Sequence, residues 1–229
     1  MLKKLYVEDA LKMPEGSEVE LLGWIRNKRI HGGLIFLDLR DRSGIIQVAV
    51  KRGVVPDGEF EQAESALRES AVRVSGTVRH DPRAPNGVEI RCRRLEVIGP
   101  SLDDFPIRKG VKVKFVLDNR HLHIRSPRVA AIMKIRARLL SAARNWLESR
   151  GFIEVNCPSF ITAAVEGGAT LFEIDYFGRK AYLTQSSQFY QEAAIYSLEK
   201  VYSLQPSFRA ELSRTRRHLT EFWHLEAEM

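Results

Sequence analysis

Short segments of alternating apolar and polar residues, separated by turn-forming residues, fill the first hundred positions of this chain. The clearest are residues 17–29, 33–53, 70–81 and 87–99, which are rich in β-branched and aromatic residues. Gly, Pro, Asp and Asn separate these segments, as is typical of turns between strands. The pattern therefore predicts a β-rich domain over residues 1–100.

One helix is expected among these strands. Within residues 57–70, Phe60, Ala63 and Leu67 recur at helical spacing. Roughly four or five strands with one helix, in about a hundred residues, fit a small closed barrel of the OB type.

The next residues lose this regularity. Residues 101–118 carry Pro106 and Gly110 without a clear period, so a hinge or linker is predicted there. Ser126, followed by Pro127, then predicts the N-terminus of a long amphipathic helix that Gly151 closes.

Residues 119–229 are predicted to form an α+β domain with a mostly antiparallel sheet. After the long helix, a strand is interrupted by Pro158, and a hairpin turns at Gly178. Residues 186–200 indicate a short helix, and two strands joined by a basic loop complete the sequence.

The two closing strands alternate with period two, so each has an apolar and a polar face. The apolar face carries Tyr202, Leu204, Phe208 and Ala210, then Leu219, Trp223, Leu225, Ala227 and Met229. The polar face carries Ser203, Gln205, Ser207, Arg209 and Glu211, then Thr220, Phe222, His224, Glu226 and Glu228. A polar face with one aromatic ring is either a solvated surface or a binding site.

Composition limits the class of protein. With 229 residues, one or two domains are expected, and the net charge of +7 suits an anionic partner such as nucleic acid. Cys92 and Cys157 lie far apart, which argues against a disulfide framework or a zinc site. No apolar run has the length of a membrane span, and residues 1–16 lack the apolar stretch of a signal peptide. We therefore expect a cytoplasmic protein without a membrane partner.

Two longer motifs carry a family resemblance. Residues 151–161, GFIEVNCPSFI, with the helix before them, resemble the first motif of class II aminoacyl-tRNA synthetases, and residues 208–226, FRAELSRTRRHLTEFWHLE, resemble the second. The similarity is to the aspartyl, asparaginyl and lysyl subgroup and extends over essentially the whole chain. It implies an OB-fold anticodon-binding domain (1–100), a hinge (101–118) and part of a catalytic domain (119–229). It also implies a homodimer through the first-motif helix and strand.

The resemblance gives the closing strands a role in amino-acid activation by ATP. Arg209 would stabilise the α-phosphate and contact the amino-acid carboxylate, and a planar guanidinium suits both contacts. Glu211 would accept from the adenine amino group, and Phe222 would stack on the adenine ring. The implied ATP set is Arg209, Glu211, Arg217, His218, Leu219 and Phe222.

Residues 185–194, QSSQFYQEAA, bear on the choice of amino acid. In the aspartyl enzymes that this segment resembles, a lysine at this position pairs with the side-chain carboxylate of the substrate. This chain has Gln191 at that position. Because an unpaired buried carboxylate is costly, the change favours an amide substrate. Residues 220–226 also resemble asparaginyl enzymes rather than archaeal-type aspartyl ones, and the chain as a whole resembles the asparaginyl branch of archaeal type. The implied amino-acid set is Glu166, Gln188, Gln191, Glu192 and Arg209.

The first domain is implied to read the anticodon of tRNA(Asn). Phe36 would stack on the central base, a uridine, and Gln47 and Glu89 would contact its edge, as single-stranded bases are commonly read. Arg26 and Arg29 would hold backbone phosphates.

The family's third motif is not found in this sequence. We therefore expect a fragment of a longer enzyme or half of a split protein, inactive in adenylation by itself, with magnesium ligands in the missing part and none in this chain. The alternatives are an aspartyl enzyme of relaxed tRNA specificity and a catalytically inactive tRNA-binding protein.

Overall fold

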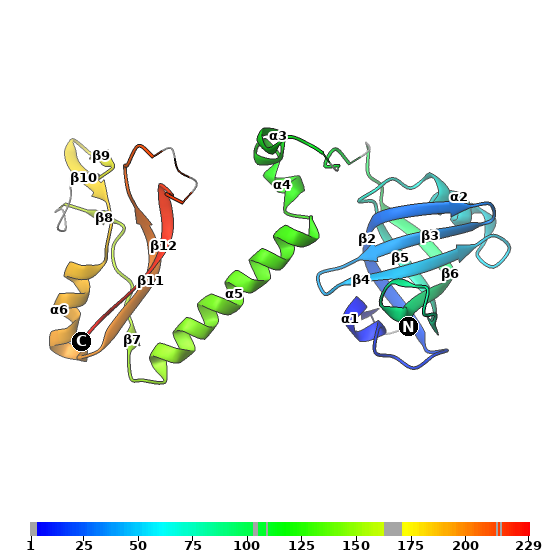
Figure 1. The fold of residues 1–229 in the computed structure, drawn as a ribbon, viewed down its shortest axis with the longest axis horizontal. Helices are drawn as coiled ribbons and strands as arrows, with labels where there is room; N and C mark the ends of the chain where they lie inside the picture. Colours follow the sequence, from blue (N-terminus) through cyan, green and yellow to red (C-terminus); the bar gives the residue numbers. More distant parts are fainter. Residues whose placement is uncertain (1–3, 103–104, 109, 163–170, 214, 216) are drawn as a thin grey trace. The chain divides into compact units, whose positions relative to one another are not determined.

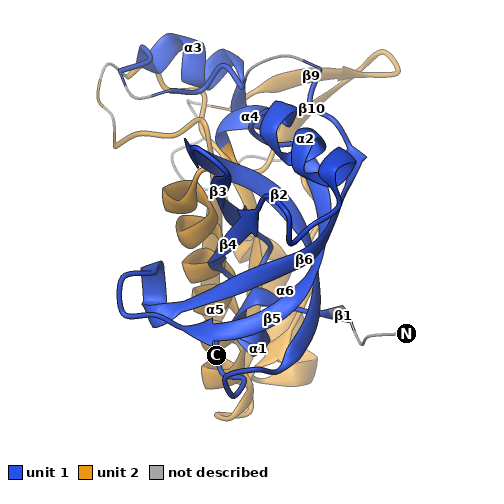
Figure 2. Cartoon of the chain, turned by 90° about the vertical axis from the view of Figure 1, so that its right-hand side faces the viewer, with its two compact units in different colours: residues 1–123 blue, residues 124–229 orange. Residues whose placement is uncertain are grey.

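The computed structural model describes residues 4–102, 105–108, 110–162, 171–213, 215 and 217–229. The chain divides into two compact units, residues 1–123 and residues 124–229 (Figure 2). The domain limits predicted from the sequence, 1–100, 101–118 and 119–229, stay a prediction.

Unit 1 is a closed β-barrel. Its strands are β1 Lys4–Leu5, β2 Glu18–His31, β3 Leu34–Arg40, β4 Ile45–Lys51, β5 Ala71–His80 and β6 Val88–Gly99. Its helices are α1 Val7–Ala10, α2 Asp57–Ser65, the 3₁₀ turn η1 Pro85–Gly87, α3 Val113–Asp118 and α4 Arg120–His123. The strand order is β1-β2-β3-β4-β6-β5, and an additional β2–β5 pairing closes the barrel (Figure 1). This is the OB-type barrel predicted from the strand pattern.

The alternation of apolar and polar residues determines which side chains face the interior of the barrel. In β3, for example, Ile35, Leu37 and Leu39 are fully buried, whereas the residues between them face outward. At Gly76 the neighbouring strand approaches closely, because a Cβ there would lie 2.1 Å from the carbonyl oxygen of Arg91. Glycine therefore permits the close approach of β6 to β5 at the register shift between Ser75 and Gly76.

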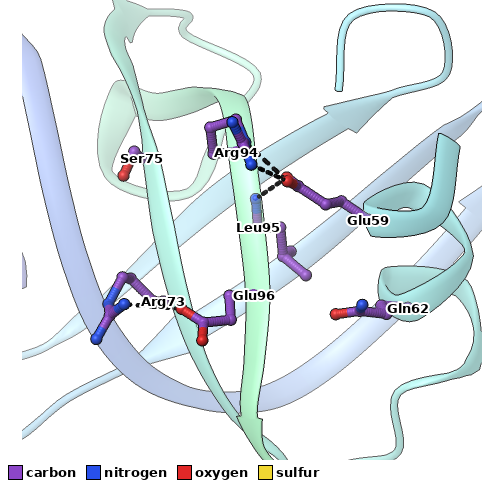
Figure 3. A pocket seen from close by; sticks show the side chains of 7 residues that line it. All are labelled: Glu59, Gln62, Arg73, Ser75, Arg94, Leu95 and Glu96. Atoms are coloured by element: carbon purple, nitrogen blue, oxygen red, sulfur yellow. Dashed lines mark hydrogen bonds and ion pairs between the residues drawn. The ribbon is translucent and has the colours of Figure 1, made fainter. Parts of the chain in front are cut away.

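Helix α2 is held against the barrel by a carboxylate and a lysine. Glu59 accepts hydrogen bonds from Nε of Arg94 and from the backbone N–H of Leu95, both at 2.7 Å (Figure 3). At the other end, Nζ of Lys28 donates to the carbonyl oxygens of Glu64 and, at 2.6 Å, Ala66. A cation at a helix C-terminus satisfies carbonyls that have no partner within the helix. The helix ends at Ser65, so Leu67, expected on its apolar face, lies beyond it.

The N-terminal segment is fastened through Asp41, whose Oδ2 accepts from the backbone N–H of Val7 at 2.8 Å. Partial burial by itself would raise the pKa of Asp41. Hydrogen bonds donated by Ser43, Val7 and Gly44 outweigh burial and lower that pKa below its ordinary value.

Part of the expected linker is helical. Residues 113–118 of the linker form α3, and residues 120–123, just beyond it, form α4, although their sequence has no clear amphipathic period. Neither helix contains a buried side chain. Helices that short bury too little for a periodic pattern to appear in the sequence.

Unit 2 contains the elements expected for an α+β domain. They are α5 Pro127–Glu148, β7 Ile153–Glu154, β8 Phe160–Ile161, β9 Glu173–Tyr176, β10 Arg179–Leu183, α6 Gln188–Leu198, β11 Val201–Phe208 and β12 Glu221–Glu228. The predicted cap is present, because Oγ of Ser126 accepts from the N–H of Val129 at 3.4 Å. The hairpin turns at Phe177 and Gly178, both with positive φ, as a type I′ turn requires.

Strands β11 and β12 pair antiparallel, and β7 adds to β11 in parallel. A second sheet has the order β8-β10-β9. On the apolar face, the hydroxyl of Tyr202 lies 3.0 Å from Oε1 of Glu148 in α5. On the polar face, α6 lies beside β11 (Figure 1), and Nε2 of its Gln191 donates to Oγ of Ser203. The β11–β12 pair therefore lies between the two helices.

The apolar face of β12 is more exposed than its alternation suggested. Trp223, Leu225 and Met229 retain 45%, 44% and 81% exposure. The guanidinium of Arg136 in α5 lies 5.5 Å from the ring centre of Trp223. A face of this kind is suited to contact further protein.

Candidate functional site

The polar face of β11 and β12 is a continuous row set by the strand register. Ser203 pairs with Glu226, Gln205 with His224, and Ser207 with Phe222. Beyond the last pair, the N–H of Arg209 donates to the carbonyl oxygen of Thr220 at 3.0 Å. Since strand residues two apart lie about 7 Å from each other, the row spans about 13 Å from Phe222 to Glu226.

The outer end of this row, beside the basic loop, opens into a cavity of about 340 Å³. Its lining residues are Arg209, Glu211, Ser213, Arg217, His218, Leu219, Thr220 and Phe222. The structure therefore brings together all six residues expected to bind ATP, and adds Ser213 and Thr220.

Arg209 and Phe222 lie next to each other in the lining of this cavity. The guanidinium carbon of Arg209 lies 5.8 Å from the centre of the Phe222 ring, within cation–π range. His218 lines the same cavity, and its Nδ1 lies 2.6 Å from Oγ of Ser213 and 2.9 Å from Oγ1 of Thr215. A flat ring beside a fixed cation can hold an aromatic base joined to an anionic group.

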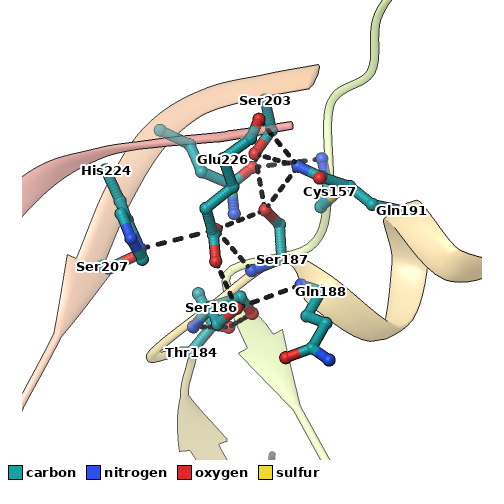
Figure 4. Close-up of polar contacts among 11 residues, drawn as sticks. Cys157, Thr184, Ser186, Ser187, Gln188, Gln191, Ser203, Ser207, His224 and Glu226 are labelled. Carbon is teal, nitrogen blue, oxygen red and sulfur yellow. Dashed lines mark hydrogen bonds and ion pairs between the residues drawn. The ribbon is translucent and has the colours of Figure 1, made fainter. Parts of the chain in front are cut away.

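The inner end of the row is a polar cluster around Glu226 (Figure 4). Oε2 of Glu226 accepts from the backbone N–H of Ser187 at 2.8 Å and from its hydroxyl at 2.6 Å. The hydroxyl of Ser186 donates to Oε1, and Nδ1 of His224 lies 3.5 Å from Oε2. The start of α6 is thereby attached to β12.

These contacts decide the charge of Glu226. Partial burial alone would raise its pKa, but the hydrogen bonds from Ser186 and Ser187, with His224 nearby, lower the pKa below its ordinary value. Glu226 is therefore ionised at neutral pH. Burial raises the pKa of the Cys157 thiol, and the negative charge of Glu226 raises it further.

Gln191 is fully buried in this cluster. Its Nε2 donates to Oγ of Ser187 at 2.9 Å and to Oγ of Ser203 at 2.7 Å. Its Oε1 is buried and has no hydrogen-bond partner within the described part of the chain. By contrast, Gln188 and Glu192 form an exposed pair at 2.8 Å. Glu166, the remaining residue of the expected amino-acid set, lies outside the described residues.

A second, larger cavity of about 1040 Å³ lies on the barrel of unit 1. Phe36, Gln47, Glu89 and Arg29 all line it, as expected for residues that act together. Phe36 is half-buried, on the face opposite its core neighbours Ile35 and Leu37. Arg26 does not contribute to the lining.

Several residues at both sites were not singled out from the sequence. In unit 2 they are Ser186, Ser187, Ser203, His224 and Glu226; in unit 1 they are His31, Arg79, Asp81 and Arg83. The period-two pattern had already placed Ser203, His224 and Glu226 on the polar face, and that signal could have identified them.

Two observations bear on metals and membranes. Within the described ranges, no group of three or more His, Cys, Asp or Glu side chains is arranged to hold a metal ion. None of the helices found in those ranges has both the length and the apolar character to span a membrane.

Comparison with protein families gives two matches. A model described as tRNA synthetases class II (D, K and N) matches residues 112–229. A model described as an OB-fold nucleic acid binding domain matches residues 19–98.

Curated relatives are similar along the whole chain. The asparagine–tRNA ligase of Thermococcus kodakarensis is 53% identical over 228 residues, which are 100% of this chain and 52% of that protein. The enzyme of the same name from Thermoplasma acidophilum is 44% identical over 97% of this chain and 52% of its own length. The chain thus spans about half the length of the curated relatives it matches.

Solved structures agree with the sequence comparisons. The asparaginyl-tRNA synthetase of Pyrococcus horikoshii, complexed with asparaginyl-adenylate, superposes with a TM-score of 0.93 at 50% identity, over 99% of this chain and 53% of that one. A putative aspartyl-tRNA synthetase from Leishmania major gives a TM-score of 0.86 at 28% identity, over 100% and 48% of the two chains.

Proposed function

Since this chain belongs to the family of class II tRNA synthetases for aspartate, lysine and asparagine, we propose that it serves to join L-asparagine to tRNA(Asn) with ATP. One observation carries the proposal. The polar face of β11 and β12 has a cation and an aromatic ring at its outer end and an ionised carboxylate at its inner end. Its length of about 13 Å suits an amino acid and a nucleotide placed end to end.

The outer end is assigned to ATP. Phe222 offers a flat ring for the adenine, and Glu211 offers an acceptor for its amino group. Arg209, anchored by its own backbone to Thr220, would neutralise charge that develops on the α-phosphate during attack by the amino-acid carboxylate. Arg217 and His218 would contact the outer phosphates. Magnesium ligands are proposed to come from outside the described residues.

The inner end is assigned to asparagine. Ionised Glu226 would repel a substrate side-chain carboxylate, whereas a side-chain amide could donate a hydrogen bond to this part of the site. Gln191 is neutral and fully buried where a charge-pairing lysine would be needed for aspartate. Gln188, Glu192 and Glu166 complete the proposed amino-acid set.

The barrel cavity is assigned to the anticodon loop. Phe36 is available for stacking, and Arg29 beside it can neutralise a phosphate, because its side chain is half exposed. Arg26 stays a proposed phosphate contact. The net charge of +7 supports binding of an RNA partner.

We further propose a cytoplasmic homodimer. Helix α5 keeps Ile132, Ile135 and Leu139 at least half exposed, so one of its faces is available to a second copy.

Binding of non-hydrolysable sulfamoyl analogues of asparaginyl- and aspartyl-adenylate to this chain, measured by calorimetry, tests the assignment. We expect the asparaginyl analogue to bind at least about tenfold more tightly, a difference of about 1.4 kcal/mol. Arg209→Gln should abolish binding of both analogues. Arg150→Gln, which removes an exposed guanidinium stacked on Trp146, should leave binding unchanged. Tighter binding of the aspartyl analogue would contradict the asparagine assignment.

A further inference from the structure

A path of buried hydrogen bonds runs from the amide of Gln191 to the carboxylate of Glu226 (Figure 4). Nε2 of Gln191 donates to Oγ of Ser187 at 2.9 Å and to Oγ of Ser203 at 2.7 Å. The two hydroxyl oxygens lie 2.5 Å apart, and Oγ of Ser187 lies 2.6 Å from Oε2 of Glu226. Gln191, Ser187 and Ser203 are at most 1% exposed, so the path is closed to solvent.

The direction of each hydrogen along this path follows from the charge of Glu226. An ionised carboxylate only accepts, so the hydroxyl hydrogen of Ser187 goes to Glu226. The Ser187 oxygen has two lone pairs, which accept from Gln191 and from the hydroxyl of Ser203. Ser203 itself accepts from Gln191, and so its hydrogen goes to Ser187. All donors on the path therefore point from Gln191 toward Glu226.

Gln191 can hold this direction because its carboxamide has one favourable orientation. Its Oε1 is buried and has no hydrogen-bond partner among the described residues. The reversed amide would leave the NH2 group there without an acceptor, which proteins tolerate less well than a carbonyl without a donor. It would also turn the carbonyl oxygen toward both hydroxyls, where it would compete with Glu226 for their hydrogens. Since Gln191 is 0% exposed, it acts on its buried neighbours and not on a substrate directly.

The contacts of Glu226 leave one of its acceptor positions open. An ionised carboxylate has about four lone-pair positions. The N–H and the hydroxyl of Ser187 occupy both positions on Oε2, and the hydroxyl of Ser186 occupies one on Oε1. The side chain of Glu226 is still 14% exposed. An incoming side chain therefore finds on Glu226 one acceptor and no donor, which suits an amide and not a carboxylate.

We propose that Gln191 is a positioning residue, which keeps the Ser187 hydroxyl donated to Glu226 and so holds this carboxylate in the acceptor-only state that favours asparagine over aspartate. The substrate preference rests on the proposed function, whereas the effect of Gln191 on Glu226 does not. Without the amide, the hydroxyl of Ser187 can turn toward Ser203, and Glu226 loses one of its donors. Glu226 then takes up a proton more readily, and a protonated carboxyl group can donate to a substrate carboxylate.

Carbon-13 NMR of the glutamate carboxyl groups, with Glu226 assigned by its loss in Glu226→Gln, measures the proton affinity of Glu226 without any ligand. Gln191→Met nearly keeps the length of the side chain and removes the amide. We expect it to raise this affinity about threefold to tenfold, because one donor to the charged form is lost.

The neighbours of Glu226 do not confuse this comparison. In the described part of the chain, its titratable neighbours are His224 and Glu228 on the same face of β12, and the thiol of Cys157. The start of α6 and strand β11 contribute neutral hydroxyl and amide groups. None of the titratable neighbours is changed in the variants, so their effects cancel.

A double-mutant cycle separates action through Ser187 from a direct effect. Ser187→Ala should raise the proton affinity of Glu226 by a similar factor, and adding Gln191→Met to it should change nothing further. Ser203→Ala removes only the competing hydroxyl and should alter this affinity less than about twofold. Gln191→Leu removes the same amide with a different shape, so the result does not depend on how one side chain packs. The matched control is Gln62→Met, at an exposed glutamine in α2 of unit 1.

Calorimetry with the sulfamoyl analogues of asparaginyl- and aspartyl-adenylate, at pH 5.5 and pH 8, measures the substrate preference of the 229-residue chain. Relative to the wild type at the same pH, Gln191→Met should lower the preference for the asparaginyl analogue about threefold to tenfold at pH 5.5. The loss should be smaller at pH 8, where Glu226 stays ionised in both proteins. Gln62→Met should match the wild type at both pH values.

The outcomes are distinguishable. Wild-type proton affinity of Glu226 in Gln191→Met and Gln191→Leu overturns the positioning role, and so does an effect that adds fully to that of Ser187→Ala. A loss of preference that is equal at both pH values also overturns it, because removal of a direct substrate contact would give that result. A wild-type chain that binds neither analogue, or prefers the aspartyl one, contradicts the proposed function, while the titration of Glu226 still decides whether Gln191 positions it.

Discussion

Replacing Glu226 by glutamine should destabilise unit 2, because the carboxylate joins β12 to the start of α6. Three donors from Ser186 and Ser187 converge on its two oxygens, and at least two of these contacts are 2.8 Å or shorter. A hydrogen bond to a charged acceptor contributes about 1 kcal/mol more than one to a neutral acceptor. Three such bonds give a gross loss of about 3 kcal/mol, which the easier burial of a neutral amide partly offsets. We therefore expect a net destabilisation of about 2 kcal/mol.

Urea unfolding at pH 7, followed by tryptophan fluorescence, measures this loss. In a Trp24→Phe background the two remaining tryptophans, Trp146 and Trp223, both lie in unit 2, so the signal reports that unit alone. The matched control is Glu192→Gln, which makes the same chemical change at an exposed pair with Gln188. Its effect should stay within about 0.5 kcal/mol.

The pH dependence gives an independent check. The folded-state pKa of Glu226 is lowered, so its stabilisation is fully present above the unfolded-state pKa of about 4.3 and is lost as pH falls through the folded-state pKa. The difference between wild type and Glu226→Gln should thus be constant near neutral pH and shrink below about pH 4.3. Equal stability of the two proteins at pH 7, or a difference that grows in acid, would refute the reasoning.

Three further changes test unit 1. Lys28→Met should cost about 1–2 kcal/mol by leaving carbonyls at the end of α2 without a donor, and faster amide exchange in that helix would report it. Asp41→Asn should weaken docking of Val7 by about 1 kcal/mol. Because the pKa of Asp41 is lowered, the wild-type advantage should persist above about pH 4 and fade in stronger acid; an advantage that grows as the pH falls would contradict it. Phe36→Ala should weaken binding of an anticodon stem-loop RNA, measured by fluorescence anisotropy, about tenfold to a hundredfold. Unchanged affinity would argue against stacking of a base on Phe36.

The sequence predicted strands β2 to β6 of the barrel because their segments are β-rich and bounded by turn residues; the two-residue strand β1 was not foreseen. It also predicted the start of α5, since Ser126 and Pro127 suit a helix N-terminus in any surroundings, and the turn at Gly178. These are local effects of backbone geometry. Helix α3 was not foreseen, because so short a helix leaves little periodic trace.

Part of the candidate site was also predicted, because the alternation of side chains along a strand is a local property of the backbone. Period two placed Arg209, Glu211 and Phe222 on one face, and the structure lines one cavity with all three. Sequence reasoning treated Gln191 as a pocket residue; the structure buries it completely, because α6 packs its start against Ser203 and Glu226. Whether it contacts a substrate remains a prediction.

The sequence by itself determined which residues share a face, because side chains alternate along any extended strand and recur on one side of any helix. Only the tertiary structure decided which groups from different elements meet. Gln47 and Glu89 are 42 residues apart, yet a parallel pairing of β4 and β6 sets their amide and carboxylate 2.9 Å from each other. That register depends on closure of the whole barrel, and so the orientation of one amide depends on contacts that no local pattern contains.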